Sequence, residues 1–233
     1  MKKLINSGGE ANIYLIQKNN KKYVHKKPIG KISLTNEIKI RREIEKRVGN
    51  SKRIVNHEKL FEKSMYLEYF PSETIEERFS KTQKRDRRLK IMLKMAFCIF
   101  ILHKNGIIHG DVSPANFLIE RGLVKITDFS HSVVGDITNN YVSLTAFSSP
   151  ETRFLRETPS KASDIFSLGL VFAKMENNFP SLEFYKDYYD LKFSNRIGII
   201  IEKMCRFEPE ERIGINEVIK RLNNLYKTRN MGV

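Results

Sequence analysis

The stretch from Ile165 to Met175 is apolar almost all the way round a helix, and it constrains the fold more than any other feature. A helix without a polar face has to be surrounded by other elements, because burial of its apolar surface is what stabilises it. The chain has 233 residues, of which 40% are hydrophobic, so it is long and apolar enough to bury such a helix on all sides. This length predicts one domain, or two tightly joined lobes, with the apolar helix near its centre.

The first third of the chain is rich in lysine and favours short strands with one helix. Thr35–Val48 has the charged amphipathic pattern of a helix. A polar turn at Asn19-Asn20 separates two of the strand candidates. Five segments have strand composition: Leu4–Asn6, Ile13–Gln17, Tyr23–Lys26, Ile54–Asn56 leading to Leu60, and Met65–Phe70.

Helical spacing dominates after Pro71. Apolar residues recur at i, i+3 and i+4 between Leu89 and Leu102, and again between Ile215 and Leu225. The fold class predicted is therefore α+β and bilobal: a small β-rich lobe over residues 1–67, a joint over 68–72 and a mainly helical lobe over 73–233.

Charge and cysteine content narrow the classes of function. There are 42 Lys and Arg against 27 Asp and Glu, a net charge of +15, which suits anionic partners without selecting one. Cys98 and Cys205 have no CxxC spacing, which excludes a disulfide scaffold and a cysteine zinc site and favours a reducing, cytoplasmic compartment. The longest apolar run, Ile91 to Leu102, is too short to cross a bilayer, so no membrane partner is expected. No motif indicates nucleic-acid binding.

Two carboxylates and an amide flank a predicted hairpin of Phe117–Ile119 and Leu123–Ile126. Asp111 and Asn116 precede it, and Asp128 follows it. Hard oxygen ligands of this kind suit Mg²⁺, and a further carboxylate can orient a hydroxyl nucleophile. Each residue alone is an ordinary turn former, so only the combination carries weight.

This combination, together with three further motifs, resembles the eukaryotic-type (Hanks-type) protein kinases along nearly the whole chain. Five motifs stand in the family's order: His109-x-Asp111-x₄-Asn116, Asp128-Phe129-Ser130, Ser149-Pro150-Glu151, Asp164 to Gly169, and Glu208 to Arg212. The resemblance implies a small, near-minimal kinase in which the segment from Asp128 to Glu151 is the activation segment.

The resemblance also implies roles. Asp111 would orient the substrate hydroxyl, and Asn116 and Asp128 would hold Mg²⁺ across the phosphates of ATP. Lys26 would reach the α and β phosphates, with Lys27 as the fallback because a one-residue slip swaps the faces of a strand. Arg212 would pair with Glu151.

The nucleotide pocket is also implied by the resemblance. Val24 would lie over the adenine, Leu67 behind it, and backbone groups of Glu68 and Phe70 would hydrogen-bond the base. The remaining predicted contacts are Asn6, Gly8, Gly9, Ala11 and Ile13, which occupy the place of the glycine-rich loop, and Leu118.

The helix glutamate that pairs with Lys26 is open between three residues. Glu43 fits the expected distance along the chain best and is the residue predicted. Glu37 fits the local apolar pattern better, and Glu45 is a third option. In the family an apolar residue packs four positions beyond this glutamate, whereas Arg47 stands four beyond Glu43.

Several positions depart from the family pattern. Gly110 replaces the arginine that receives an activation-segment phosphate, which makes control by that route less expected. Ser113 replaces a lysine near the transferred phosphate, and Ser130 replaces a glycine.

The predicted function is transfer of the ATP γ-phosphate to a protein hydroxyl, with Ser or Thr expected. Two alternatives stay open: a small-molecule or tRNA-modification-complex-associated atypical kinase, and a pseudokinase scaffold. The protein substrate and the oligomeric state are not identified by the sequence.

Overall fold

A computed structural model describes residues 2–7, 10–79, 85–135, 144–177 and 195–230. Its first part is one antiparallel sheet with the strand order β1-β2-β3-β5-β4, and one helix, α1, lies beside that sheet. The elements are β1 (Lys2–Ser7), β2 (Ala11–Lys18), β3 (Lys21–Pro28), α1 (Thr35–Arg47), β4 (His57–Leu60) and β5 (Met65–Glu68).

The second part is mainly helical. Its helices are α2 (Ile75–Phe79), α3 (Arg85–Lys104), α4 (Pro150–Phe154), α5 (Lys161–Asn177), α7 (Arg196–Met204) and α8 (Ile215–Asn230), with short 3₁₀ turns η1 (Pro114–Asn116) and η2 (Pro209–Glu211). Its strands are β6 (Glu73–Thr74), β7 (Ile107–Ile108), β8 (Phe117–Glu120), β9 (Leu123–Ile126) and β10 (Val133–Val134). Among the described residues, no helix is both long and apolar enough to cross a membrane.

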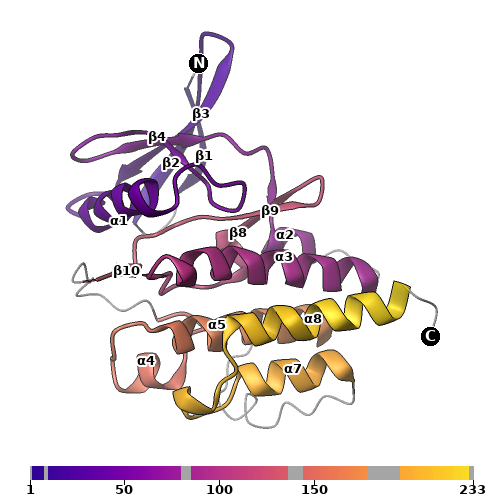
Figure 1. Cartoon of the computed structure of the whole chain (residues 1–233). Coiled ribbons are helices and arrows are strands. Elements are labelled where there is room, and N and C mark those ends of the chain that lie inside the picture. The colour runs from indigo at the N-terminus through magenta and orange to yellow at the C-terminus, as the bar shows by residue number, and fades with distance from the viewer. Residues whose placement is uncertain (1, 8–9, 80–84, 136–143, 178–194, 231–233) are drawn as a thin grey trace.

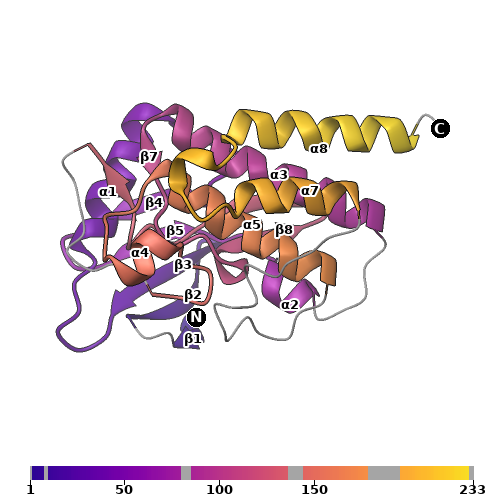
Figure 2. The ribbon, with the colours of Figure 1, turned by 90° about the horizontal axis from the view of Figure 1, so that it is seen from below.

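Figure 1 shows the two parts as an upper sheet and a lower stack of helices, with the β8–β9 hairpin between them. From below, α3, α5, α7 and α8 run side by side (Figure 2). The predicted α+β, bilobal fold is confirmed, with the five strands and one helix expected in the small lobe.

The central helix predicted from its apolar pattern is α5. Every residue from Ser163 to Ala173 is buried, and α5 packs against both α3 and α7. Gly169 allows the close contact with α7, because a Cβ there would lie 2.9 Å from the Cβ of Met204. The helix is therefore enclosed, as its lack of a polar face requires.

The strand predicted from Ile54–Asn56 to Leu60 is present only in its second half, as β4. Ile54 and Val55 are both buried, so this segment does not alternate between two faces as an edge strand would. Ile54 instead forms a single parallel bridge with Ile126 of β9, and the Val55 N–H donates to the Ile126 carbonyl at 2.9 Å. The strand itself begins at His57, and the preceding residues link the sheet to the hairpin below it.

The Glu151–Arg212 ion pair expected from the resemblance is confirmed. Arg212 Nη1 and Nη2 donate to the two carboxylate oxygens of Glu151 at 2.7 and 2.8 Å. Further Arg212 donors reach the carbonyls of Arg206, Ala162 and Phe207. The pair is buried and fixes α4 to the start of α5 and to the loop before α8.

We predict that Glu151→Gln lowers the free energy of unfolding at pH 7 by about 3 kcal/mol, because it leaves a buried guanidinium without its counter-charge. Burial raises the pKa of the Glu151 carboxyl, but hydrogen bonding and charge from Arg212 outweigh it, so the pKa lies below its ordinary value of 4.5. A carboxyl with a lowered folded-state pKa stabilises above its ordinary pKa and loses that contribution as the pH falls. The gap between wild type and variant should therefore narrow below about pH 4.5.

Urea unfolding at pH 7 and pH 3.5 measures this gap, with exposed Glu157→Gln as the matched control. A gap of equal size at both pH values would show that the Glu151 charge is not the source of the stabilisation.

Candidate active site

Lys26 sits at the centre of a charge cluster between the two parts of the molecule, in which Lys26 and Glu37 are buried and Asp128 is partly exposed. It lies on the inner face of β3, opposite Ile13 of β2 and Met65 of β5. Its ammonium is 2.7 Å from Glu37 Oε2 and 2.9 Å from Asp128 Oδ1. Lys26 is 5% exposed and Lys27 is exposed, so the register places Lys26, and not the fallback, in the cluster.

Both members of the Lys26–Asp128 pair are held in their charged forms. Burial lowers the pKa of the Lys26 ammonium, but the carboxylates of Glu37 and Asp128 outweigh that effect and leave it above its ordinary value. Burial likewise raises the pKa of Asp128, and the charge and hydrogen bond of Lys26 reverse the shift. Asp128 is therefore an ionised carboxylate at neutral pH.

The prediction that Glu43 pairs with Lys26 is wrong. Glu43 instead accepts from Arg47 Nε at 2.8 Å on the outer side of α1, and Glu45 approaches His57. Glu37 takes the pairing position because α1 begins at Thr35, which puts its first turn directly against β3. The helical period carries the right signal, since Glu37, Arg41 and Ile44 share one buried face.

Asp111 and Asn116 are joined by two hydrogen bonds. Asn116 Nδ2 donates to the Asp111 carbonyl at 2.8 Å and to Asp111 Oδ2 at 2.9 Å. η1 produces this closeness, because its tight turn brings residue 116 back onto residue 111. Since the amide nitrogen is engaged, the amide oxygen of Asn116 is left as its ligand atom.

The oxygen atoms present fit a magnesium ion with bound phosphates. Asp128 offers a carboxylate that is 37% exposed, and Asn116 offers an amide oxygen. Within the described parts of the chain no group of three His, Cys, Asp or Glu gathers as an all-protein metal site. Mg²⁺ typically takes one or two protein ligands and completes its shell with phosphate and water, which agrees with this sparse set.

Asp164 at the start of α5 holds the backbone of the Asp111 loop. Its two carboxylate oxygens accept from the N–H groups of His109 and Gly110 at 2.8 and 2.9 Å, and His103 Nε2 lies 2.8 Å from Oδ2. The His109 ring accepts from the Asp111 N–H at Nδ1, so its Nε2 donates to the Thr127 carbonyl at 3.0 Å. The loop is thereby tied both to the buried helix and to the residue before Asp128.

The predicted nucleotide pocket residues come together from both parts of the chain. Ala11 and Leu67 belong to one buried apolar cluster, against which Ile13, Val24 and Leu118 pack. Leu118 comes from β8, below the sheet, so the cluster has apolar walls on two sides. Asn6 is exposed on β1 opposite Ile13. The predicted contacts Gly8 and Gly9 lie outside the described residues.

The hinge contains an interaction that sequence reasoning missed. Glu68 Oε1 accepts from the buried ammonium of Lys125 and from the backbone N–H of Asn56 at 2.8 Å. Lys125 also lies over the ring of Phe70, 5.3 Å from its centroid. A lysine inside the apolar run Leu123 to Ile126 is the signal, because a buried cation requires a partner.

Comparisons with known proteins agree with this geometry. The family model described as the protein kinase domain matches residues 1–222. The chain belongs to that family.

Individual relatives are distant and much longer. Over 162 residues the chain is 25% identical to the interferon-induced, double-stranded RNA-activated protein kinase of Rattus norvegicus, covering 64% of this chain and 32% of that protein. It is 29% identical over 169 residues to mitogen-activated protein kinase kinase kinase 4 of Mus musculus, covering 67% of this chain and 10% of the relative. It is also 29% identical over 160 residues to the serine/threonine-protein kinase MPS1 of Encephalitozoon cuniculi, covering 59% and 26%. The chain thus spans a third or less of these relatives.

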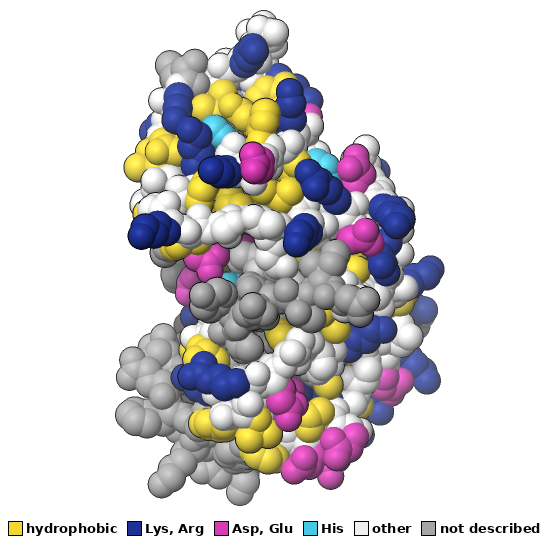
Figure 3. All heavy atoms as spheres, turned by 90° about the vertical axis from the view of Figure 1, so that its left-hand side faces the viewer, with side chains coloured by type: hydrophobic (Ala, Val, Ile, Leu, Met, Phe, Trp, Pro, Cys, Tyr) yellow, Lys and Arg dark blue, Asp and Glu magenta, His cyan; other side chains and the backbone are white. Residues whose placement is uncertain are grey.

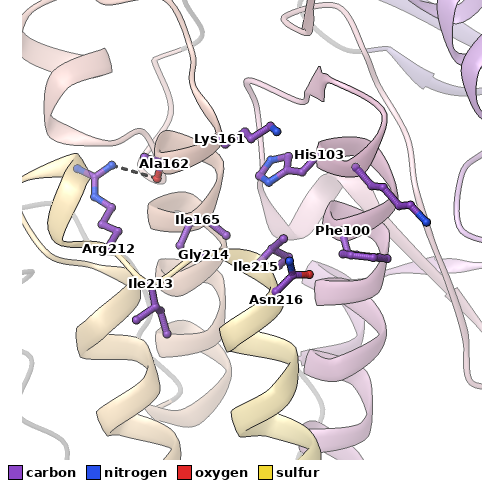
Figure 4. Close-up of a pocket in the computed structure, with 11 residues that line it drawn as sticks. Phe100, His103, Lys161, Ala162, Ile165, Arg212, Ile213, Gly214, Ile215 and Asn216 are labelled. Carbon is purple, nitrogen blue, oxygen red and sulfur yellow. Dashed lines mark hydrogen bonds between the residues drawn. The ribbon is translucent and has the colours of Figure 1, made fainter.

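A cavity of about 450 Å³ lies in the helical part of this kinase domain, away from the charge cluster. The loop from Arg212 to Gly214 and the start of α8 form its wall between α5 and α3, and Phe100, His103 and Lys161 lie around it (Figure 4). His103 and Arg212 already bond to Asp164 and Glu151, so the cavity is lined by residues that hold the Asp111 loop and α4.

Gly110, which replaces the family's arginine before the catalytic aspartate, cannot be exchanged for any other residue without a backbone shift. Its φ is +75°, and a Cβ there would lie 2.2 Å from the carbonyl oxygen of His131. The loop and the residues after Asp128 are therefore packed too closely for a side chain at position 110.

We predict that Gly110→Ala lowers the free energy of unfolding by about 3 kcal/mol or more, since overpacking adds to left-handed strain. Gly49→Ala is the matched control: φ there is +68° and nothing lies within 4 Å of the added Cβ, so only the strain of about 1–2 kcal/mol is expected. Chemical denaturation measures both variants. Equal losses would mean that the approach of His131 does not restrict position 110.

Proposed function

We propose that this chain is an ATP-dependent protein kinase that phosphorylates serine or threonine. The observation that carries the proposal is the linked set of side chains between the two parts of the molecule: Lys26 bridges Glu37 and Asp128, while Asn116 is bonded to Asp111. Phosphoryl transfer requires mainly positioning and charge neutralisation, and these five side chains supply both.

Each of the five residues has its own task in phosphoryl transfer. Lys26 binds the α and β phosphates, and Glu37 keeps its ammonium in place. Asp128 and the amide oxygen of Asn116 would hold Mg²⁺, which would neutralise charge on the phosphates. Asp111 orients the substrate hydroxyl and takes its proton while the hydroxyl oxygen bonds to the γ-phosphorus. The bond from that phosphorus to the bridging oxygen breaks, and ADP leaves with the electron pair.

The adenine pocket belongs to the same proposal. Val24 and Leu118 enclose the base from above and below, Leu67 closes the back, and backbone groups of Glu68 and Phe70 hydrogen-bond it. The apolar cluster shared by β2, β3, β5 and β8 supports this assignment. The lobe boundaries at 67/68 and 72/73 are part of the proposal; the start of β6 at Glu73 supports the second boundary, and β5 extends one residue past the first, to Glu68.

Serine/threonine specificity is supported by the name of one similar protein, the serine/threonine-protein kinase MPS1 of Encephalitozoon cuniculi. The similar protein TTK of Mus musculus is named a dual-specificity kinase, so tyrosine is the competing acceptor to test. The substrate proposed is a protein of unspecified identity.

The basic charge gives weak support for a particular anionic partner. On the face that Figure 3 shows, Lys and Arg side chains are spread over the upper and lower parts of the molecule and alternate with Asp and Glu. Dispersed charge of this kind serves solubility.

A reducing, cytoplasmic compartment is supported by the free thiols of Cys98 and Cys205, for which burial raises the pKa to about 12.

We predict that Asp111→Asn and Asp128→Asn each reduce phosphate transfer from γ-labelled ATP to protein by at least about a hundredfold, because one removes the proton acceptor and the other a metal ligand. Incubation with Mg²⁺ and a basic and an acidic protein substrate measures the transfer, and phosphoamino-acid analysis identifies the acceptor. Exposed Asp86→Asn is the matched control. Wild-type protein that binds ATP but labels only small molecules, or no acceptor, would contradict the proposal.

The ion pair between Glu37 and Lys26 gives a second prediction. Glu37→Gln should lower kcat by about tenfold or more, because an amide cannot balance the buried Lys26 ammonium. Glu43→Gln, the same change on the outer side of the helix, should stay within about twofold of wild type. Steady-state kinetics with varied ATP separates kcat from KM. A larger loss at Glu43 would overturn the Glu37 assignment.

A further inference from the structure

Arg41 on α1 is the largest of the fully buried side chains in the described residues, and it carries a charge. It stands four residues beyond Glu37, the position where the family packs an apolar residue. Burial of a guanidinium costs free energy unless it is paired with acceptors or a counter-charge. The groups that contact Arg41 therefore indicate its role.

Arg41 holds the same glutamate as Lys26 does. Its Nε donates to Glu37 Oε1 at 2.9 Å, and its Nη2 lies 2.9 Å from the same oxygen. Lys26 takes the other oxygen, Oε2. The Glu37 carboxylate is therefore bound on both sides and cannot rotate away from Lys26 without breaking its bonds to Arg41.

Arg41 also contacts the segment that carries Asp128. Its guanidinium lies 5.1 Å from the ring centroid of Phe129, which is fully buried, and its Nη1 donates to the Val55 carbonyl at 2.9 Å. The contacts close a ring: Lys26 to Asp128, along the chain to Phe129, then to Arg41, Glu37 and back to Lys26. A closed ring of contacts resists displacement of any one member.

The charges within this ring balance. Glu37 and Asp128 supply two carboxylates, and Lys26 and Arg41 supply two cations. An apolar residue at position 41 could pack on Phe129, but it would leave two carboxylates sharing one ammonium. Arg41 therefore both packs on Phe129 and supplies the second cation, whereas an apolar residue could only pack there and a surface arginine could do neither.

We propose that Arg41 is a positioning residue that keeps Glu37 and Phe129 in the arrangement used for phosphoryl transfer, without phosphorylation of the activation segment or a bound partner. This inference rests on the proposed function. A second tie acts on the same helix: Asn36 Nδ2 donates to the Ser130 carbonyl at 2.8 Å. Gly110, where no side chain fits, removes the arginine that would read an activation-segment phosphate.

The test uses full-length protein, dephosphorylated and checked by intact mass, as wild type, Arg41→Leu, Arg41→Lys and Arg42→Leu. Arg42 is exposed, so Arg42→Leu is the same change one residue along the helix. We expect unphosphorylated wild type to be active, and Arg41→Leu to lose about tenfold or more in kcat with ATP KM within about threefold. Arg41→Lys should recover part of the loss, and Arg42→Leu should match wild type. A fully active Arg41→Leu, or a wild type that needs phosphorylation for activity, would overturn the proposal.

Two further readouts separate positioning from folding and from the proposed function itself. In a double-mutant cycle, Arg41→Leu should add little to the loss already caused by Glu37→Gln, whereas an independent structural effect would add in full. Amide hydrogen exchange should rise over residues 35–47 and 126–132 in Arg41→Leu only. If wild type transfers no phosphate, the proposed function fails, and exchange still decides on Arg41: unchanged exchange in Arg41→Leu would show that Arg41 holds nothing in place.

Discussion

The buried carboxylate of Asp164 is the interaction on which the site depends most directly. It is 1% exposed at the first turn of the enclosed helix α5, and its oxygens accept from two successive backbone N–H groups of the loop that carries Asp111. Loops place functional groups accurately only when a rigid element holds their backbone. Here the rigid element is the helix whose burial the sequence demands, so the apolar pattern of α5 and the position of Asp111 are parts of one arrangement.

The charges of Lys26, Glu37 and Asp128 fix the positions of α1 and the Asp128 loop more than they stabilise the fold. A buried ion pair gives up hydration that its attraction only partly restores, so Lys26, Glu37 and Asp128 are weak evidence for a stable fold. They are strong evidence for a defined geometry, because an ammonium bonded to two carboxylates at 2.7 and 2.9 Å fixes the distance between the helix and the loop that carry them. The same reasoning applies to Glu151 and Arg212, which fix α4 instead of the nucleotide end.

Sequence alone predicted the parts of the fold that repeat a local pattern. Four of the five strands of the small lobe and the enclosed helix follow from local composition and periodicity, whereas the Glu151–Arg212 pair follows from the resemblance to the family. The errors fall where a residue's partner lies far along the chain. Ile54 lies in a segment of strand composition, yet its bridge partner is Ile126 in β9. Glu43 was chosen by distance along the chain, although the helical face carrying Arg41 and Ile44 selects Glu37. Lys125 and Glu68 are 57 residues apart, and no local pattern links them.

These distant contacts converge on one short stretch of chain. Ile126 takes the bridge from Ile54, Lys125 reaches Glu68 in the hinge, Asp128 meets Lys26, and the Ser130 carbonyl accepts from Asn36. β9 and the residues after it are thus bonded to the hinge, to β3 and to α1 of the upper part. Displacement of the sheet against the helices would have to bend or break this stretch, which also carries Asp128, the proposed metal ligand. The residues from Lys125 to Ser130 therefore fix Asp128 relative to both parts of the molecule, and a substitution in β9 that leaves Asp111, Asn116 and Asp128 intact would still disturb the position of Asp128.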